Sequence, residues 1–318
     1  MNNFAVSILI ISRDRRDLLC RVLGDLRAQQ YDGEFEIVVV EETDDPQAPI
    51  GVSYVSHPMK NLGIAYARNL SLEHAKHDIL VFIDDDCRVD SDWLTKLVTP
   101  LKDEKVLGVQ GGVTVPDGTN GIGWAESLLG FPGGGITRVI QAEGQTQDTK
   151  EISTLNACYR KSAVMKAGGF SNHARFGGED YLLAKQVAGK GKLLFTPLAQ
   201  VQHEARGHLP AIWTWFVRRG RAEYDLWQSG LAPQGYGVWM LRSSLLLKLL
   251  PLMILCYWSV LPLILFLLFL VVVNRWRFRW VLQHKNIPTS AWLWLPWVRL
   301  VMGAATDIGR VKSWAHWK

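Results

Sequence analysis

Apolar and polar residues alternate in a regular way over the first 110 positions of the chain. Continuous apolar runs, typical of strands buried on both faces of a sheet, occupy residues 4–11, 36–40, 79–83 and 106–110. Between them, apolar residues recur at helical spacing over 18–26, behind a cap at Ser12 or Asp14, and further helices are expected at 63–75 and 93–101. With a short extended piece at 52–55, this pattern predicts an α/β fold with right-handed crossovers.

The pattern weakens beyond residue 110. Residues 111–151 are rich in glycine and polar side chains, so we expect a loop-rich and mobile stretch. An apolar segment follows at 155–164, and a helix is predicted at 181–188. A final short strand is expected at 193–195.

Acidic residues stand at the carboxyl ends of two predicted strands. Glu41 and Glu42 end one strand, and Asp84, Asp85 and Asp86 end another. Ligands of open α/β sheets bind beyond these strand ends. Adjacent carboxylates repel one another, and Mg²⁺ or Mn²⁺ completed by substrate phosphates would neutralise them. The alternative is an acidic, solvated turn, because aspartate is a common turn residue.

Composition divides the chain near residue 210. Only two of the fourteen tryptophans, Trp93 and Trp124, precede Trp213, and the long apolar run also lies in the last third. A net charge of +5 without a long basic tract favours membrane phosphates over nucleic acid as the anionic partner. Four scattered cysteines without metal or redox spacing fit a reducing compartment.

The C-terminal third is expected to be attached to a membrane. Residues 249–273 form an uncharged apolar run that is long enough for a transmembrane or re-entrant segment. The alternative is a buried helix of a soluble protein. Basic residues flank both ends, so the charge distribution does not decide the orientation. We assign 211–248 to an amphipathic linker and 274–318 to an interfacial tail whose tryptophans suit the headgroup region.

Five motifs in order give the chain a resemblance to a known family. They are Val-Ser-Ile-Leu-Ile-Ile-Ser-Arg-Asp-Arg at 6–15, Glu-Ile-Val-Val-Val-Glu-Glu at 36–42, Asn-Leu-Gly-Ile-Ala-Tyr-Ala-Arg-Asn at 61–69, Phe-Ile-Asp-Asp-Asp at 82–86 and Gly-Glu-Asp at 178–180. Together they resemble a family 2 glycosyltransferase of GT-A fold over residues 4–205. The resemblance implies a mixed, mainly parallel sheet flanked by helices over 1–210. The nucleotide-sugar half would be 1–110 and the acceptor half 111–210.

The resemblance also implies how the donor is held. Ser12, Arg15, Glu41 and Glu42 would face the base and ribose, and Arg68 would lie near the diphosphate. Asp84 and Asp86 match the family's D-x-D positions, where the first approaches the ribose or the metal and the second coordinates Mg²⁺ or Mn²⁺, and Asp84 and Asp85 would also belong to the nucleotide-sugar site. The ion would act as a Lewis acid on the leaving diphosphate. The family usually has proline and threonine at 11 and 12 and aspartate at 41 and 42, so base recognition departs from its pattern.

Two further residues complete the site that the resemblance implies. Asp180, supported by Glu179, takes the position of the general base, and the anomeric centre would be inverted. The alternative is that both acids only begin a helix, where negative charge is favoured. His203 is a candidate third metal ligand or a structural histidine.

Nucleotide-sugars are made in the cytosol, so we expect the catalytic domain on the cytosolic face of the inner membrane. The acceptor would be a lipid-linked or cell-surface saccharide, in cell envelope polysaccharide biosynthesis. The Arg-Arg-Gly-Arg motif at 218–221 would bind donor phosphates or lipid headgroups. The alternatives are a sugar nucleotidyltransferase, although no glycine lies at 12–16, and a non-catalytic membrane scaffold.

Overall fold

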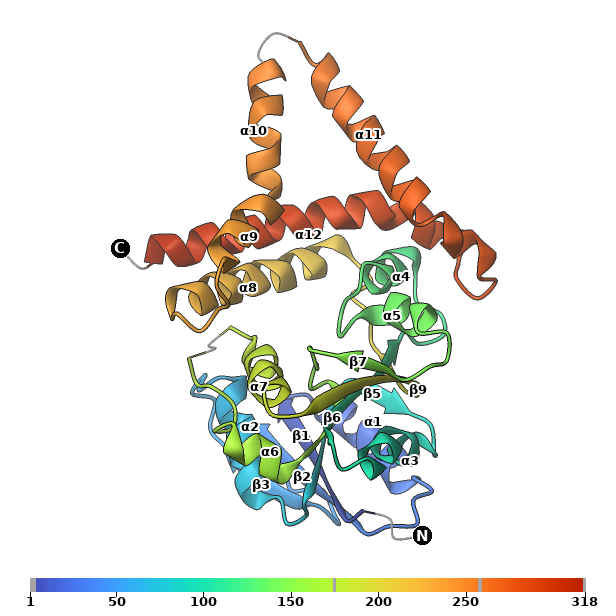
Figure 1. The fold of residues 1–318 in the computed structure, drawn as a ribbon, viewed down its shortest axis with the longest axis vertical. Coiled ribbons are helices and arrows are strands. Elements are labelled where there is room, and N and C mark those ends of the chain that lie inside the picture. Colours follow the sequence, from blue (N-terminus) through green and yellow to red (C-terminus); the bar gives the residue numbers. More distant parts are fainter. Residues whose placement is uncertain (1–3, 174–175, 257–258, 317–318) are drawn as a thin grey trace. The chain divides into compact units, whose positions relative to one another are not determined.

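A computed structural model describes residues 4–173, 176–256 and 259–316. The chain separates into two compact units (Figure 1). Unit 1 contains residues 1–116 and 132–204, and unit 2 contains residues 117–131 and 205–318.

A single sheet forms the centre of unit 1. Its strand order is β3-β2-β1-β4-β8-β6-β9-β5, with β7 paired to β9. The first four strands run parallel, in the order Ser53–His57, Phe35–Glu42, Val6–Arg13 and Ile79–Asp84. In this register Ser12 lies beside Glu41 and Ile11 beside Asp84, so the polar ends of β1, β2 and β4 share one edge of the sheet.

The other strands make the sheet mixed. Strand β8 (Asn156–Arg160) is antiparallel to both β4 and β6 (Val106–Thr114), and β9 (Lys192–His203) is parallel to β6. Strands β5 (Cys87–Val89) and β7 (Gln147–Thr149) are antiparallel to β9.

Helices cover both faces because alternate residues of each strand point to opposite faces. Ile8 and Ile10 of β1 pack in a core with α1 (Arg16–Arg27) and α3 (Trp93–Val98). Leu9 packs in a second core with α2 (Ile64–His74), α6 (Lys161–Lys166) and α7 (Glu179–Ala188). The predicted helix at 93–101 ends at Val98 and continues as the 3-10 turn η1 (Thr99–Lys102).

The expectation that 111–151 is loop-rich missed several regular elements. This stretch contains the end of β6, two short helices, α4 (Gly121–Leu128) and α5 (Gly135–Gln141), and β7. The expected strand at 193–195 was too short, because β9 passes through Pro197 at an irregular register and ends at His203. His203 therefore belongs to the strand instead of following it.

Unit 2 is helical. Besides α4 it contains α8 (Leu209–Gln228), α9 (Tyr236–Ser243), α10 (Leu245–Cys256), α11 (Leu261–Arg277), the 3-10 turn η2 (Arg279–Gln283) and α12 (Thr289–His316). Helices α8 and α12 are joined by an ion pair between Arg310 and Glu223. The apolar run predicted as one segment at 249–273 is divided between α10 and α11, and residues 257–258 lie outside the described part. Within the described residues, none of the helices combines the length and apolar character needed to cross a bilayer.

Candidate functional site

The carboxyl ends of β4 and β9 bring three predicted metal ligands together. Asp84 ends β4, Asp86 follows it by two residues, and His203 is the last residue of β9. One ligand atom from each of these residues lies within 4.8 Å of the other two. His203 Nε2 is 3.4 Å from Asp86 Oδ1. Local strand pairing explains the arrangement, because Cys87 of β5 is in register with His203.

The chemistry of this group fits a divalent cation. Asp86 Oδ1 and His203 Nδ1 are buried and have no hydrogen-bond partner among the described residues. Two carboxylates and one imidazole suit Mn²⁺ and also Mg²⁺, which prefers oxygen ligands and substrate phosphates. Burial raises the pKa of Asp84, and the Asp86 carboxylate raises it further, against the opposing charge of Arg68. A bound cation would stabilise the ionised form of both aspartates.

Asp85 points into the protein and organises the loop after β1. Its side chain is fully buried, accepts a hydrogen bond from Ser12 Oγ at 2.8 Å and pairs with Arg15 at 2.6 Å. Burial raises the pKa of Asp85 to about 7, although Arg15 and Ser12 oppose the shift. Arg15 also lies 3.0 Å from Asp86 Oδ2 and keeps 46% of its side chain exposed. Arg15 is thus the cation at this edge that faces solvent beside the metal ligands.

Arg68 lies between the metal ligands and the predicted base. It emerges from α2, is 6% exposed, pairs with the buried Glu179 and lies 3.7 Å from Asp84 Oδ1. Its guanidinium also stacks over the Phe170 ring at 5.6 Å. One buried cation therefore holds the first residue of α7 beside the end of β4.

Asp180 occupies the first turn of α7, directly after Glu179. Its Oδ1 accepts a hydrogen bond from the Tyr181 backbone N–H at 2.8 Å. The side chain is partly exposed. This hydrogen bond orients the carboxylate at the start of α7, where a carboxylate oxygen can act as a proton acceptor.

The two glutamates at the end of β2 are held by internal partners that the sequence did not reveal. Glu41 accepts hydrogen bonds from Tyr54 at 2.6 Å and Arg16 at 3.2 Å. Glu42 accepts one from the Asn61 backbone N–H at 2.7 Å and pairs with Arg13 at 3.3 Å. Both glutamates are buried at the same strand edge as Ser12.

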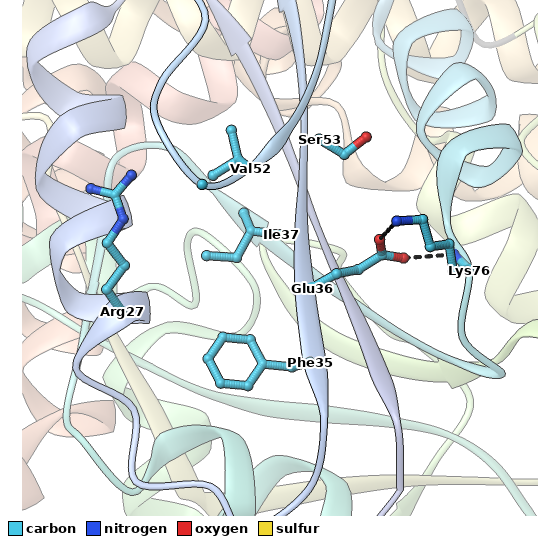
Figure 2. A pocket seen from close by; sticks show the side chains of 8 residues that line it. Arg27, Phe35, Glu36, Ile37, Val52, Ser53 and Lys76 are labelled. Carbon is cyan, nitrogen blue, oxygen red and sulfur yellow. Dashed lines mark hydrogen bonds and ion pairs between the residues drawn. The ribbon is translucent and has the colours of Figure 1, made fainter.

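A separate hollow lies at the amino ends of β2 and β3 (Figure 2). Glu36 in this hollow already accepts hydrogen bonds from Ser7 Oγ at 2.7 Å and from the Lys76 backbone N–H at 2.6 Å. The hollow is at the opposite ends of the strands from the aspartates, so it is not part of the candidate site. Its lining consists of Arg27, Phe35, Glu36, Ile37, Gly51, Val52, Ser53 and Lys76.

Comparison with known proteins assigns the chain to a family. Residues 7–167 match the family described as Glycosyl transferase family 2, and the chain belongs to that family. The succinoglycan biosynthesis protein ExoM of Rhizobium meliloti (strain 1021) is 31% identical over 178 residues, which cover 55% of this chain and 54% of ExoM. The O-antigen biosynthesis protein RfbC of Myxococcus xanthus is 26% identical over 209 residues, covering 58% of this chain and 16% of RfbC. The chain therefore spans about half the length of ExoM and a smaller share of RfbC.

A solved structure supports the predicted GT-A-like fold. The mannosyltransferase PcManGT from Pyrobaculum calidifontis, in complex with GDP-Man and Mn²⁺, superposes with a TM-score of 0.62. The similarity covers 97% of this chain and 86% of PcManGT, at 18% sequence identity. The mixed α/β sheet flanked by helices is thereby confirmed as GT-A-like.

Proposed function

We propose that the protein transfers a sugar from a nucleotide-diphosphate sugar to a hydroxyl of a saccharide acceptor, with inversion of the anomeric centre. The observation that carries the proposal is the convergence of Asp84, Asp86 and His203 at one strand edge, with Arg68 joining that edge to Glu179. Membership of the family and the succinoglycan and O-antigen relatives support sugar transfer as the reaction class.

Asp180 would act as the general base. A carboxylate oxygen of Asp180 would take the proton of the acceptor hydroxyl as the hydroxyl oxygen bonds to the anomeric carbon. The bond between the anomeric carbon and the phosphate oxygen breaks, and the nucleoside diphosphate leaves with the electron pair. Attack opposite the leaving group inverts the centre. Because Glu179 is buried and paired with Arg68, its role is to fix the start of α7 and thus the position of Asp180.

Asp84, Asp86 and His203 would hold Mg²⁺ or Mn²⁺, which supplies Lewis-acid stabilisation of the leaving diphosphate. Arg15 is exposed beside Asp86 and would reach a donor phosphate, whereas the buried Arg68 would act mainly through Glu179. Ser12, Glu41 and Glu42 stay candidates for the nucleoside side of the pocket. They line the adjacent strand ends, and Ser12 reaches Asp85.

The acceptor would be a lipid-linked or cell-surface saccharide at the cytosolic face of the inner membrane. The exposed apolar side chains of α10 and α11 support membrane attachment. Donors made in the cytosol would then meet an acceptor already held in the membrane. The names of the succinoglycan and O-antigen relatives support polysaccharide biosynthesis as the setting.

The test is a donor panel of UDP-, GDP- and dTDP-sugars incubated with the full chain, membrane lipid extract and Mn²⁺. Nucleoside diphosphate release is measured with and without chelator, and the linkage in the product is assigned by NMR. Chelator-sensitive release from one donor with an inverted linkage supports the proposal. A retained anomeric configuration contradicts the inverting role of Asp180, and donor binding without turnover favours a non-catalytic scaffold.

A further inference from the structure

Unit 2 contains a long stretch without negative charge. Between Asp225 and Asp307 the sequence has no aspartate or glutamate. The same stretch contains basic residues in and near the outer ends of α10 and α11, namely Arg242, Lys248, Arg275, Arg277, Arg279, Lys285 and Arg299. A surface built from this stretch is therefore complementary to anions.

Helices α10 and α11 expose large apolar side chains. On α11 the side chains of Leu261, Leu265, Phe269 and Val272 are 57%, 56%, 61% and 64% exposed. Leu250 of α10 is 53% exposed. Leu263 and Ile264 are also exposed, so the apolar residues are not limited to one stripe of α11. A helix that is apolar on all sides is typical of an apolar surrounding such as lipid.

Both ends of this helical pair are fixed to the same helix, α12. At the start of α10, Ser244 Oγ donates to Asp307 Oδ2 at 3.0 Å, and the Leu246 backbone N–H donates to the same oxygen at 2.9 Å. At the end of α11, Arg299 donates to the buried Asn274 Oδ1 at 2.9 Å. Arg299 and Asp307 are eight residues apart, which corresponds to about 12 Å along a helix. Figure 1 shows α10 and α11 leaving α12 on the same side.

Tryptophans and arginines gather near these attachment points. Trp276, at the end of α11, is 67% exposed, and Trp294 and Trp297 of α12 are 36% and 43% exposed. Arg279 lies over the Trp276 ring at 5.6 Å. Amphipathic tryptophan rings prefer the headgroup level of a bilayer, and arginines there attract anionic lipids.

We infer that α10 and α11 form a re-entrant hairpin that inserts into an anionic lipid leaflet and returns to the surface it entered. Both attachment points on α12 then lie at the same lipid surface, with the arginines against phosphate headgroups. The inference deepens the proposed function, since it names the surface on which a membrane-held acceptor would be met.

Labelling of introduced cysteines tests the path of the hairpin. Leu241→Cys and Leu282→Cys place exposed thiols before α10 and after α11, in a chain with Cys20→Ser and Cys256→Ser. Inside-out and right-side-out membrane vesicles are treated with a membrane-impermeant maleimide. We expect both thiols to react from the same side as the exposed Cys20 of unit 1 in a reference chain that carries only Cys256→Ser. Reaction of the two positions from opposite sides would show that the segment spans the bilayer and would overturn the inference.

Vesicle flotation tests whether membrane binding depends on anionic lipid. The purified chain is mixed with phosphatidylcholine vesicles with or without phosphatidylglycerol. We expect binding to favour the anionic vesicles. Replacing Arg277 and Arg279 by glutamine should weaken anionic binding by roughly 25-fold, at about fivefold per charge. A control variant with both Lys102→Gln and Lys105→Gln makes the same charge change on unit 1. It should bind the vesicles as the wild type does.

The flotation result is independent of catalysis, because Asp180→Asn should float as the wild type does. Failure of sugar transfer with normal flotation would leave the hairpin inference intact. Equal binding to both vesicle types would overturn the anionic assignment. A stable dimer in lipid-free buffer that does not bind vesicles would show that a second copy of the chain covers the hairpin instead.

Discussion

Replacing Arg68 by methionine should separate a positioning role from donor binding. The change removes the cationic member of the ion pair with Glu179, whose carboxylate is 3% exposed. Breaking a buried ion pair by removing one partner costs about 3 kcal/mol at the low end. Asp84 is 36% exposed and 3.7 Å away, so it adds little to this cost. Unfolding of unit 1 should shift down by roughly 6–12 °C for a domain of this size.

The double variant Arg68→Met/Glu179→Leu is the matched test of coupling. Apolar replacement of both members of a buried pair is often neutral, so its stability should return to within about 1 kcal/mol of the wild type. Arg27→Met serves as the control, because it removes an exposed arginine of the same unit. Calorimetry measures the wild type, Arg68→Met, Glu179→Leu, the double variant and Arg27→Met. If the double variant loses as much as the two single variants together, Arg68 and Glu179 are not energetically coupled.

Steady-state kinetics then identifies what Arg68 does in the reaction. Displacing a catalytic group by about 1 Å can reduce turnover by about 100-fold. In Arg68→Met we therefore expect kcat to fall by that order, while KM for the donor changes little. A raised KM with unchanged kcat would mean that Arg68 contributes uniform binding to the donor. That result would refute the positioning role and favour the sequence-based assignment of Arg68 to the diphosphate.

Three further predictions address the metal ligands, unit 1 and unit 2. His203→Ala should weaken Mn²⁺ binding by at least about tenfold. Electron paramagnetic resonance titration measures the affinity, and His77→Ala is the control. Unchanged Mn²⁺ affinity in His203→Ala would remove His203 from the metal site. Burial raises the pKa of Glu36, but hydrogen bonds from Lys76 and Ser7 lower it below its ordinary value of 4.5. Its stabilising contribution is thus present above that value and lost as pH falls through the folded-state pKa, so urea denaturation of Glu36→Gln should be less sensitive to acid than that of the wild type. Gly220→Ala would place a Cβ against the Thr306 carbonyl of α12 and should destabilise unit 2 by about 1–3 kcal/mol, whereas Gly24→Ala in α1, with open space around it, should not destabilise unit 1.

The sequence predicted the part of the fold where pattern and burial agree. Strands β1, β2 and β4 are short, continuous apolar runs buried by helices on both faces, and their predicted bounds match closely. Helices α4 and α5 were missed because they have eight and seven residues, both begin with a glycine, and α4 contains a second glycine. Short helices of this kind depend on tertiary packing more than on intrinsic propensity.

The sequence at the end of β9 contains a pattern that indicates a longer strand than predicted. Ala199, Val201 and His203 are buried while Gln200 and Gln202 are exposed, and this alternation with a period of two is typical of a strand. Following it would have placed His203 within the sheet. The partners of Glu41 and Glu42 were not predictable, because Tyr54 and Asn61 meet them only through the pairing of β3 with β2 and the turn before α2.

The predicted site residues fall into groups that the sequence alone did not distinguish. Asp84, Asp86 and His203 come together as possible metal ligands, whereas Asp85 turns inward to Ser12 and Arg15. Consecutive residues at the end of a strand point to different sides, so three adjacent aspartates cannot all face one ion.

Nucleoside diphosphate release by Asp180→Asn, compared with the wild type, tests the central claim most directly. Release from the productive donor is measured with Mn²⁺ and a saccharide acceptor, and donor affinity is measured in parallel by calorimetry. If Asp180 is the general base, release should fall by about 10²–10⁴-fold while donor affinity stays within a few-fold of the wild type. Turnover that persists in Asp180→Asn would contradict the assignment of the base and, with it, the proposed mechanism.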